Sequence, residues 1–215
     1  MNDGLRGDIV RVAAELERRG LNHNSAGNVS ARLGADMLVT PSGIPAGAMQ
    51  PADIVHLALD GTPWPDPLGR RPSSEWRLHA AIYAGRSDVS AIVHTHSIEA
   101  TAAACVGRPI PAVHYVVARA GDVEIPCAPY ATYGSVELAA NVVGALGRRG
   151  RACLMANHGM VAVGESLDDA LTLAHDVEWL ASVRRRAHQL GVPVVLDPDE
   201  IARVAEQLRD YGQPR

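Results

Sequence analysis

The sequence contains no lysine, and all twenty of its basic residues are arginine. A side-chain Schiff base needs a lysine amine, so imine chemistry of that kind is excluded. A phosphate-binding P-loop is excluded as well, because its motif requires a lysine. If the protein stabilises a carbanion or an enolate, a bound metal ion is therefore the expected electrophile.

The sequence also lacks an excess of positive charge and a long apolar run, and both absences bear on its binding partners. The formal net charge is −4, so the charge balance does not favour nucleic acid or an anionic membrane surface as a partner. No apolar run is long enough to span a bilayer, and the first six residues lack the pattern of a signal peptide. We therefore expect a cytoplasmic protein that binds neither nucleic acid nor membrane.

Cysteine is scarce, and its three residues form no Cys-x-x-Cys pair. Cys105, Cys127 and Cys153 are widely spaced, which favours small buried side chains in a reducing compartment over disulfides. Cys127 lies in a segment rich in proline and tyrosine. A structural role for it is favoured over a nucleophilic one.

A chain of 215 residues suits one domain, which we expect to span residues 1–215. Hydrophobic periodicity and turn residues predict helices at 5–19, 73–84 (with a serine N-cap), 98–106, 135–146, 166–189 and 199–209. Strands are predicted at 29–33, 37–40, 54–59, 91–94, 111–117, 123–125, 152–155 and 160–163. Because strands arrive both in hairpins and between helices, a mixed or mostly antiparallel sheet with helical layers is favoured over a doubly wound sheet.

An apolar run at residues 91–93 leads into His94 and His96. Residues i and i+2 of a strand lie on one face, so the two imidazoles can aim at one point. His158 follows a second predicted strand, and Glu75 lies at the start of a predicted helix. Three histidines and one glutamate make a suitable set for a zinc-like ion that keeps an exchangeable position. The alternative for the histidine pair alone is a surface strand with two solvated side chains.

Three loop segments are rich in backbone N–H and hydroxyl donors, namely residues 27–30, 42–43 and 73–74. The third segment precedes a predicted helix, whose N-terminus favours a phosphate group. Each segment alone is explained more simply as a turn or a helix cap. The combination is sharper because Glu75 follows Ser74 directly, so a phosphate bound there would lie beside the metal. A carboxylate that leaves a metal when substrate arrives can then act as a base beside a polarised carbonyl.

Together these motifs resemble the class II aldolase and adducin-head family. The similarity runs in register from about residue 20 to residue 211 and is greatest toward the L-fuculose-phosphate aldolase branch of that family. It rests on seven segments, at residues 27–30, 40–45, 72–77, 93–96, 110–115, 125–132 and 158–159.

The resemblance implies an α/β fold, a three-layer α/β/α single domain with a central, mainly antiparallel sheet, assembled as a homotetramer with sites at subunit interfaces. It implies Zn²⁺, with Mn²⁺ or Co²⁺ as alternatives, on Glu75, His94, His96 and His158. It implies that the substrate phosphate is held by Gly27, Asn28, Ser42, Gly43, Ser73 and Ser74. Two tyrosines of the family reach the site from the neighbouring subunit. They match Tyr115 and Tyr211, which together with Glu75 would be the catalytic residues.

The implied activity is reversible cleavage of a ketose 1-phosphate to dihydroxyacetone phosphate and a small aldehyde. L-Fuculose 1-phosphate, giving L-lactaldehyde, is the first candidate, followed by related deoxyketose phosphates. Asn157 and Tyr133 depart from the family pattern near the expected aldehyde half, which leaves the particular sugar open. Two alternatives remain: a sugar-phosphate dehydratase or epimerase on the same scaffold, and a non-catalytic adducin-like interaction domain. Val116 argues against the epimerase because that branch has aspartate there.

Overall fold

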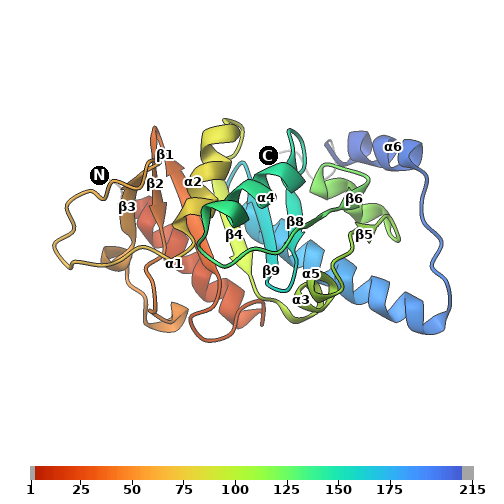
Figure 1. Ribbon diagram of the computed structural model, residues 1–215, viewed down its shortest axis with the longest axis horizontal. Helices are drawn as coiled ribbons and strands as arrows, with labels where there is room; N and C mark the ends of the chain where they lie inside the picture. The colour runs from red at the N-terminus through yellow and green to blue at the C-terminus, as the bar shows by residue number, and fades with distance from the viewer. Residues whose placement is uncertain (1–2, 210–215) are drawn as a thin grey trace.

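Seven strands form one sheet in the order β3-β2-β1-β4-β9-β8-β7 within residues 3–209, which the computed structural model describes (Figure 1). All neighbours in this sheet are antiparallel except β7 and β8. The strands are β1 (Asn28–Leu33), β2 (Asp36–Val39), β3 (Val55–Ala58), β4 (Ala91–Thr95), β7 (Cys127–Ala128), β8 (Ala152–Met155) and β9 (Gly159–Gly164). A separate pair joins β5 (Ile110–Pro111) to β6 (Glu124–Ile125).

Helices cover both faces of the sheet, which confirms the expected three-layer α/β/α fold with a mainly antiparallel sheet. α1 (Asp3–Arg18), α3 (Ile98–Cys105), α5 (Leu167–Leu190) and α6 (Pro198–Arg209) share one hydrophobic core. α2 (Trp76–Gly85) and α4 (Val136–Leu146) share the core on the opposite face. Two short 3₁₀ turns, η1 (Ala46–Ala48) and η2 (Pro51–Asp53), precede β3. None of the helices described is long and apolar enough to cross a membrane.

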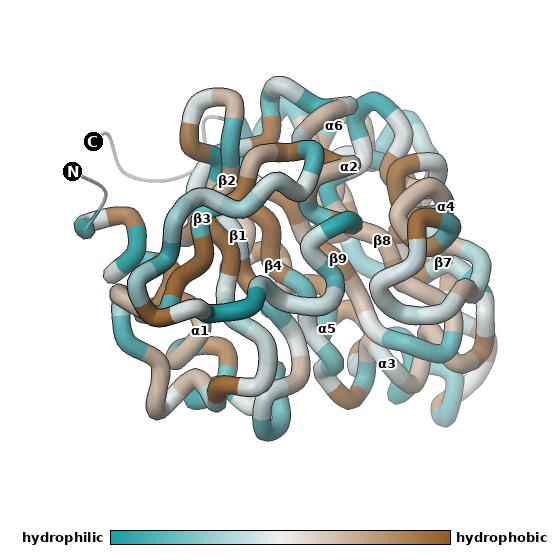
Figure 2. The backbone as a smooth tube through the Cα atoms, turned by 60° about the vertical axis from the view of Figure 1, so that its left-hand side comes forward, coloured by the Kyte–Doolittle hydropathy of each residue, from teal (hydrophilic) through white to brown (hydrophobic). Residues whose placement is uncertain are grey.

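The two cores follow from the alternation of side chains along each strand. In β8, Leu154 packs into the core with α1 and α5, whereas its neighbour Cys153 packs into the core with α2 and α4. In β9, Met160 and Val161 divide in the same way. Central strands with both faces buried must be apolar along their length, and the middle of the sheet in Figure 2 carries long hydrophobic stretches.

Two of the predicted helix starts are confirmed in detail. The hydroxyl of Ser135 accepts a hydrogen bond from the Leu138 backbone N–H at 3.1 Å, and this bond caps α4. Ser166 caps α5 in the same way. The predicted serine N-cap of α2 is wrong, because Glu75 occupies the N-cap position and the helix begins at the next residue. The hydroxyl of Ser73 instead accepts from the Glu75 N–H at 3.3 Å and fixes the turn before the helix.

The strand predicted at residues 111–117 is also wrong beyond its first residue. The chain turns instead into a 3₁₀ helix, η3 (Tyr115–Ala120). The side chain of His114 accepts from the Val116 N–H at 3.3 Å, and its carbonyl accepts from the Val117 N–H at 3.1 Å. These local bonds compete with strand pairing and win, although the apolar run resembles a strand.

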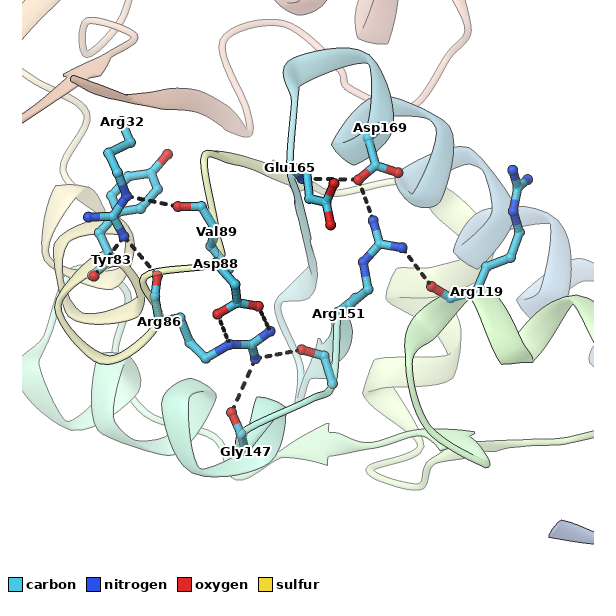
Figure 3. A network of polar contacts seen from close by, with 11 residues as sticks. Arg32, Tyr83, Arg86, Asp88, Val89, Arg119, Gly147, Arg151, Glu165 and Asp169 are labelled. Atoms are coloured by element: carbon cyan, nitrogen blue, oxygen red, sulfur yellow. Dashed lines mark hydrogen bonds and ion pairs between the residues drawn. The ribbon is translucent and has the colours of Figure 1, made fainter. Parts of the chain in front are cut away.

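Arginines tie together the loops near the start of β4, the end of that strand opposite to His94, and Figure 3 shows their contacts. Arg86 donates to the carbonyl oxygens of Gly147 and Gly150, at 3.2 and 2.9 Å, and forms a two-pronged ion pair with Asp88. Arg32 donates to three more carbonyl oxygens, one in the last turn of α2 and two in the segment between α2 and β4. These belong to Tyr83, Arg86 and Val89. The segments that follow α2 and α4 are thus held by charged side chains bound to backbone.

Candidate active site

Glu75, His94, His96 and His158 converge, with one ligand atom from each lying within 4.8 Å of all the others. The Nε2 atoms of His94 and His96 are 3.0 Å apart, as expected for side chains on one face at the end of a strand. Oε2 of Glu75 lies 3.1 Å from Nε2 of His94, and Oε1 lies 3.3 Å from Nε2 of His158. The four side chains predicted as metal ligands therefore share one point in space.

The hairpin between β8 and β9 brings His158 to the end of β4. Its tight turn places Asn157 at a φ of 54°, and the His158 N–H donates to the Met155 carbonyl oxygen at 3.0 Å. A side chain at Gly159 would collide with the carbonyl oxygen of Thr95. Glycine at this position therefore lets the hairpin pack directly against the strand that carries the other two histidines.

The ring of His94 is oriented by backbone. Its Nδ1 atom lies 2.8 Å from the carbonyl oxygen of Met160, to which it donates. The other nitrogen, Nε2, is left facing Glu75 and the two other histidines. A backbone carbonyl bound to the outer nitrogen is the usual way in which proteins fix the orientation of a metal-binding imidazole.

The charges of the cluster are shaped by burial and by mutual contact. Burial, together with the positive charge of His94, lowers the pKa values of His96 and His158 to about 4, so both rings are neutral at neutral pH. Burial alone would lower the pKa of His94, but the Glu75 carboxylate outweighs it and raises that pKa. Burial would raise the pKa of Glu75, yet its contacts with His94, His158 and Asn28 lower it below the ordinary value. Glu75 is therefore an ionised carboxylate.

One oxygen of this carboxylate lacks a hydrogen-bond partner. Oε1 of Glu75 is buried and accepts no hydrogen bond from any described residue. A buried carboxylate oxygen without a partner is costly, and a divalent cation in the cluster would supply the missing interaction. Neutral imidazoles with a carboxylate suit zinc, manganese or cobalt. The residues present therefore fit a divalent ion.

A cavity of about 310 Å³ opens onto the cluster. It is lined by Glu75, His96 and His158 and by all six residues predicted to hold phosphate, Gly27, Asn28, Ser42, Gly43, Ser73 and Ser74. Gly27 has a φ of 75°, and a Cβ atom there would lie 2.6 Å from the His94 carbonyl oxygen. This close approach brings the loop before β1 against the end of β4 and joins the two predicted subsites in one cavity.

The predicted tyrosines behave differently. Tyr115 lies on η3, half-exposed and beside the ring of His114, and is not among the residues that line the cavity. Tyr211 lies outside the described residues. Two other tyrosines, Tyr130 and Tyr133, do line the cavity, as does Asn157. Cys127 does not line it, and burial raises the pKa of its thiol, which agrees with the structural role favoured for it. The expected burial of all three cysteines is wrong for Cys105, which is exposed at the end of α3.

A line of buried hydrogen bonds behind Glu75 was not predicted from the sequence. Nδ2 of Asn28 lies 3.0 Å from Oε2 of Glu75, and Oδ1 of Asn28 lies 2.5 Å from Nε2 of His79. Nδ1 of His79 lies 2.6 Å from the hydroxyl of Ser30, which lies 2.8 Å from the hydroxyl of Tyr83. All five residues are buried, and burial lowers the pKa of His79 to about 3. The neutral line runs from the interior of α2 to the candidate metal ligand.

The spacing of these residues was a signal for the line. Glu75, His79 and Tyr83 recur every four residues and so share one face of a helix. Asn22 was missed as well, and its side-chain oxygen accepts from the His96 N–H at 3.3 Å. It lies in a polar loop with no pattern that distinguishes it from its neighbours.

The family model described as Class II Aldolase and Adducin N-terminal domain matches residues 7–184. The chain belongs to this family. The match contains all four residues of the histidine and glutamate cluster and every residue of the predicted phosphate loops. It therefore covers the whole candidate site apart from Tyr211.

Curated relatives span nearly the whole chain. The chain is 46% identical over 208 residues to the 5-methylthioribulose-1-phosphate/5-deoxyribulose-1-phosphate aldolase of Rhodospirillum rubrum, covering 97% of this chain and 92% of that protein. It is 44% identical over 209 residues to the L-fuculose phosphate aldolase of Escherichia coli strain K12, with 97% and 95% covered. A solved structure of an L-fuculose 1-phosphate aldolase superimposes with a TM-score of 0.91 at 36% identity, covering 95% of each chain.

Proposed function

We propose that the protein is a metal-dependent aldolase, which cleaves a ketose 1-phosphate reversibly to dihydroxyacetone phosphate and a small aldehyde. The observation that carries this proposal is the shared cavity. Three of the four candidate metal ligands line the same cavity as the loops of Gly27, Ser42 and Ser73; these ligands are Glu75, His96 and His158. Relatives of this family at 44% and 46% identity bear the names of ketose-phosphate aldolases. Both observations support one substrate class.

Each part of the cavity has a role in this proposal. The loops hold the phosphate through backbone N–H groups and serine hydroxyls, since no lysine is present in the chain. When bound, a divalent ion supplies positive charge that polarises the substrate carbonyl and stabilises the negative charge left on the dihydroxyacetone phosphate half. The four side chains that would hold it are Glu75, His94, His96 and His158.

Two proton transfers accompany cleavage of the bond between C3 and C4. Removal of the proton from the C4 hydroxyl lets that oxygen become the aldehyde carbonyl, while the bonding electrons pass to C3. We assign this proton to Tyr115 of a neighbouring subunit, in a homotetramer with shared sites, and Tyr211 would reach the site in the same way. Glu75 is ionised at rest, so it takes up a proton from solvent and delivers it to C3, which completes dihydroxyacetone phosphate, while Tyr115 accepts the C4 hydroxyl proton as a phenolate and returns it to solvent. In the reverse direction the Glu75 carboxylate removes the C3 proton and the Tyr115 hydroxyl protonates the new C4 oxygen.

The relatives bear the names of different sugars, which differ in the half of the substrate that becomes the aldehyde. Tyr130, Ala131, Tyr133 and Asn157 also line the cavity, and we assign these residues to the aldehyde half. L-Fuculose 1-phosphate and 5-deoxyribulose 1-phosphate or its methylthio analogue are the two candidates. Zinc is the proposed metal, and a cytoplasmic location and one domain over residues 1–215 stay predictions.

A panel of ketose 1-phosphates tests the function. Metal-loaded protein is incubated with L-fuculose 1-phosphate, 5-deoxyribulose 1-phosphate, 5-methylthioribulose 1-phosphate and fructose 1-phosphate, and dihydroxyacetone phosphate release is measured. We expect release from at least one deoxyketose phosphate and little from fructose 1-phosphate. A dehydrated or epimerised product without dihydroxyacetone phosphate would show that the protein is a sugar-phosphate dehydratase or epimerase and not an aldolase. Absence of any product, with metal bound, would sink the proposal.

Subunit mixing tests the shared site. Tyr115→Phe subunits are mixed with Glu75→Gln subunits under conditions of proven subunit exchange. If Tyr115 serves a neighbour's cavity, some mixed assemblies contain an intact site and activity returns. No recovery would mean that Tyr115 has no role across the interface.

A further inference from the structure

The buried line behind Glu75 is built by a helix and a strand whose spacings match. Four residues of helix advance about 6 Å, and two residues of strand advance about 6.8 Å. Glu75 and His79 on the helical side therefore meet Asn28 and Ser30 on β1. Asn28 lies between them, in contact with both Glu75 and His79. His79 is therefore connected to the Glu75 carboxylate through the side chain of Asn28.

The chemistry of each group fixes the direction of every bond in the line. An ionised carboxylate only accepts, so Asn28 presents its amide nitrogen to Glu75 and its oxygen to His79. Nε2 of His79 must then carry the proton. Its Nδ1 atom accepts from Ser30, whose oxygen is free to accept from Tyr83. One orientation of the whole line follows from the charge at its end.

We propose that His79 is a positioning residue, which holds the Asn28 side chain with its nitrogen toward Glu75 and thereby keeps the carboxylate in place as the base of the reaction. The amide of an asparagine is nearly symmetric in shape, so nothing in its own geometry stops it from turning over. Turned over, it would point an oxygen at the carboxylate and repel it. The N–H of His79 prevents this because it pairs only with the oxygen end.

The contact with Asn28 also makes the two carboxylate oxygens of Glu75 different in their hydrogen bonding. Oε2 is held by Asn28 at 3.0 Å, whereas Oε1 has no hydrogen bond from a described residue. The carboxylate thus keeps one fixed partner within the protein whether or not its other oxygen is engaged. Buried outer-shell partners of this kind typically affect activity by about 10- to 100-fold. This assignment rests on the proposed function, because it names the partner of the proposed base.

Substitutions at His79 and Tyr83 test the assignment. His79→Leu removes the N–H, whereas His79→Gln can still offer an amide N–H to Asn28. Tyr83→Phe is the matched control, because it removes one buried hydrogen bond from the same helix while Ser30 still donates to His79. Zinc-loaded proteins are compared for metal content, KM, kcat and exchange of the C3 proton of dihydroxyacetone phosphate in deuterated water.

We expect His79→Leu to keep its metal and KM while kcat and proton exchange fall about 10- to 100-fold. His79→Gln should recover most of the exchange, and Tyr83→Phe should behave as the wild type. Three results would overturn the assignment: unchanged exchange in His79→Leu, a change in KM alone, or a loss explained entirely by missing metal. If His79→Leu does not fold, the test passes to His79→Gln. His79→Gln should still exchange the C3 proton. If its exchange falls about 10- to 100-fold while Tyr83→Phe is unaffected, an amide N–H at this position does not position Asn28, and the assignment is overturned.

A second measurement keeps this inference separate from the proposed function. Nitrogen-15 NMR of the imidazoles in metal-loaded wild-type protein reports which nitrogen of His79 is protonated, without any substrate. We expect the neutral ring with hydrogen on Nε2. Hydrogen on Nδ1 would overturn the line even in an active aldolase. A protein that shows the expected ring but cleaves no ketose 1-phosphate would instead refute the function and leave the orientation of Asn28 established.

Discussion

Tyr83 belongs to two polar networks, one of neutral side chains and one of arginines bound to backbone carbonyl oxygens. Its hydroxyl bonds to Ser30 and begins the neutral line that ends at Glu75. Its carbonyl oxygen accepts from Arg32, whose guanidinium also lies 4.7 Å from the centre of the tyrosine ring. The neutral line joins side chain to side chain, whereas the arginines join charged side chains to the backbone of loops (Figure 3).

The difference shows how one helix can serve two purposes. In the neutral line the bonds from Ser30 through His79 and Asn28 to Glu75 each set the direction of the next, so the loss of His79 frees the Asn28 side chain that faces the site. In the arginine network each guanidinium has several carbonyl partners, and the loss of one arginine leaves unpaired oxygens. The first network is therefore expected to govern activity and the second to govern stability.

The largest expected effect lies at the end of the neutral line. His94→Gln removes a buried imidazole from a set of four ligand groups, and we expect loss of bound metal and of all measurable aldolase activity. Elemental analysis and the dihydroxyacetone phosphate assay measure both. The control is His175→Gln, which changes an exposed histidine of α5. A His94→Gln protein that retains metal and activity would remove this histidine from the site.

Glu75→Gln is expected to separate binding from chemistry. Three imidazoles can hold zinc without the carboxylate, so most of the metal should remain. The amide cannot accept the proton, and kcat should fall by roughly 10²- to 10⁴-fold. Exchange of the C3 proton of dihydroxyacetone phosphate should be lost in parallel. Retained exchange in the metal-replete variant would show that another group is the base.

Metal retention should depend on pH through His94. Its raised pKa means that the metal-free site binds a proton more readily than an ordinary histidine, so protons compete with the metal at a higher pH than they would at an ordinary histidine. His96 and His158, with pKa values of about 4, add competition only in stronger acid. Equilibrium dialysis against a metal buffer should show release on the acid side. Constant affinity down to about pH 5 in folded protein would contradict these charges.

Arg86→Ala tests the other network. Two carbonyl oxygens, of Gly147 and Gly150, lose their charged donor, which should lower the free energy of unfolding by about 2 kcal/mol. The kcat of the folded protein should not change. Arg148→Ala is the matched control, since this arginine of the same segment is exposed and its removal should cost less than about 0.5 kcal/mol. Equal denaturant midpoints for the two variants would refute the stabilising role of Arg86.

Strong local patterns made much of the molecule predictable. The apolar run into His94 and the hairpin at His158 gave both strands and ligand types, because the alternation of a strand determines which side chains share a face. The mainly antiparallel sheet followed from strands arranged in hairpins. The helix starts near residues 135 and 166 were predicted from the sequence, the second from hydrophobic periodicity, and Ser135 and Ser166 cap these helices.

The failures have physical causes of two kinds. Residues 111–117 look like a strand, but the side chain of His114 bonds to its own backbone and turns the chain. His79 lies in a helix with mostly apolar neighbours, and only its spacing from Glu75 and Tyr83 hints at a role. That hint becomes informative only when the partner residues on β1 are known, since a helix face does not reveal what packs against it.

The sheet order places β4, the strand that carries His94, fourth among seven, with β1 and β9 bonded along its two edges. Local opening of a sheet begins at its outer strands, so the amide hydrogens of β4 should exchange with solvent only when the whole domain unfolds. Hydrogen exchange should therefore divide the site into a slow part and a fast part. The backbone beneath His94 should be among the slowest, and the exposed positions of the loops around Ser42 among the fastest.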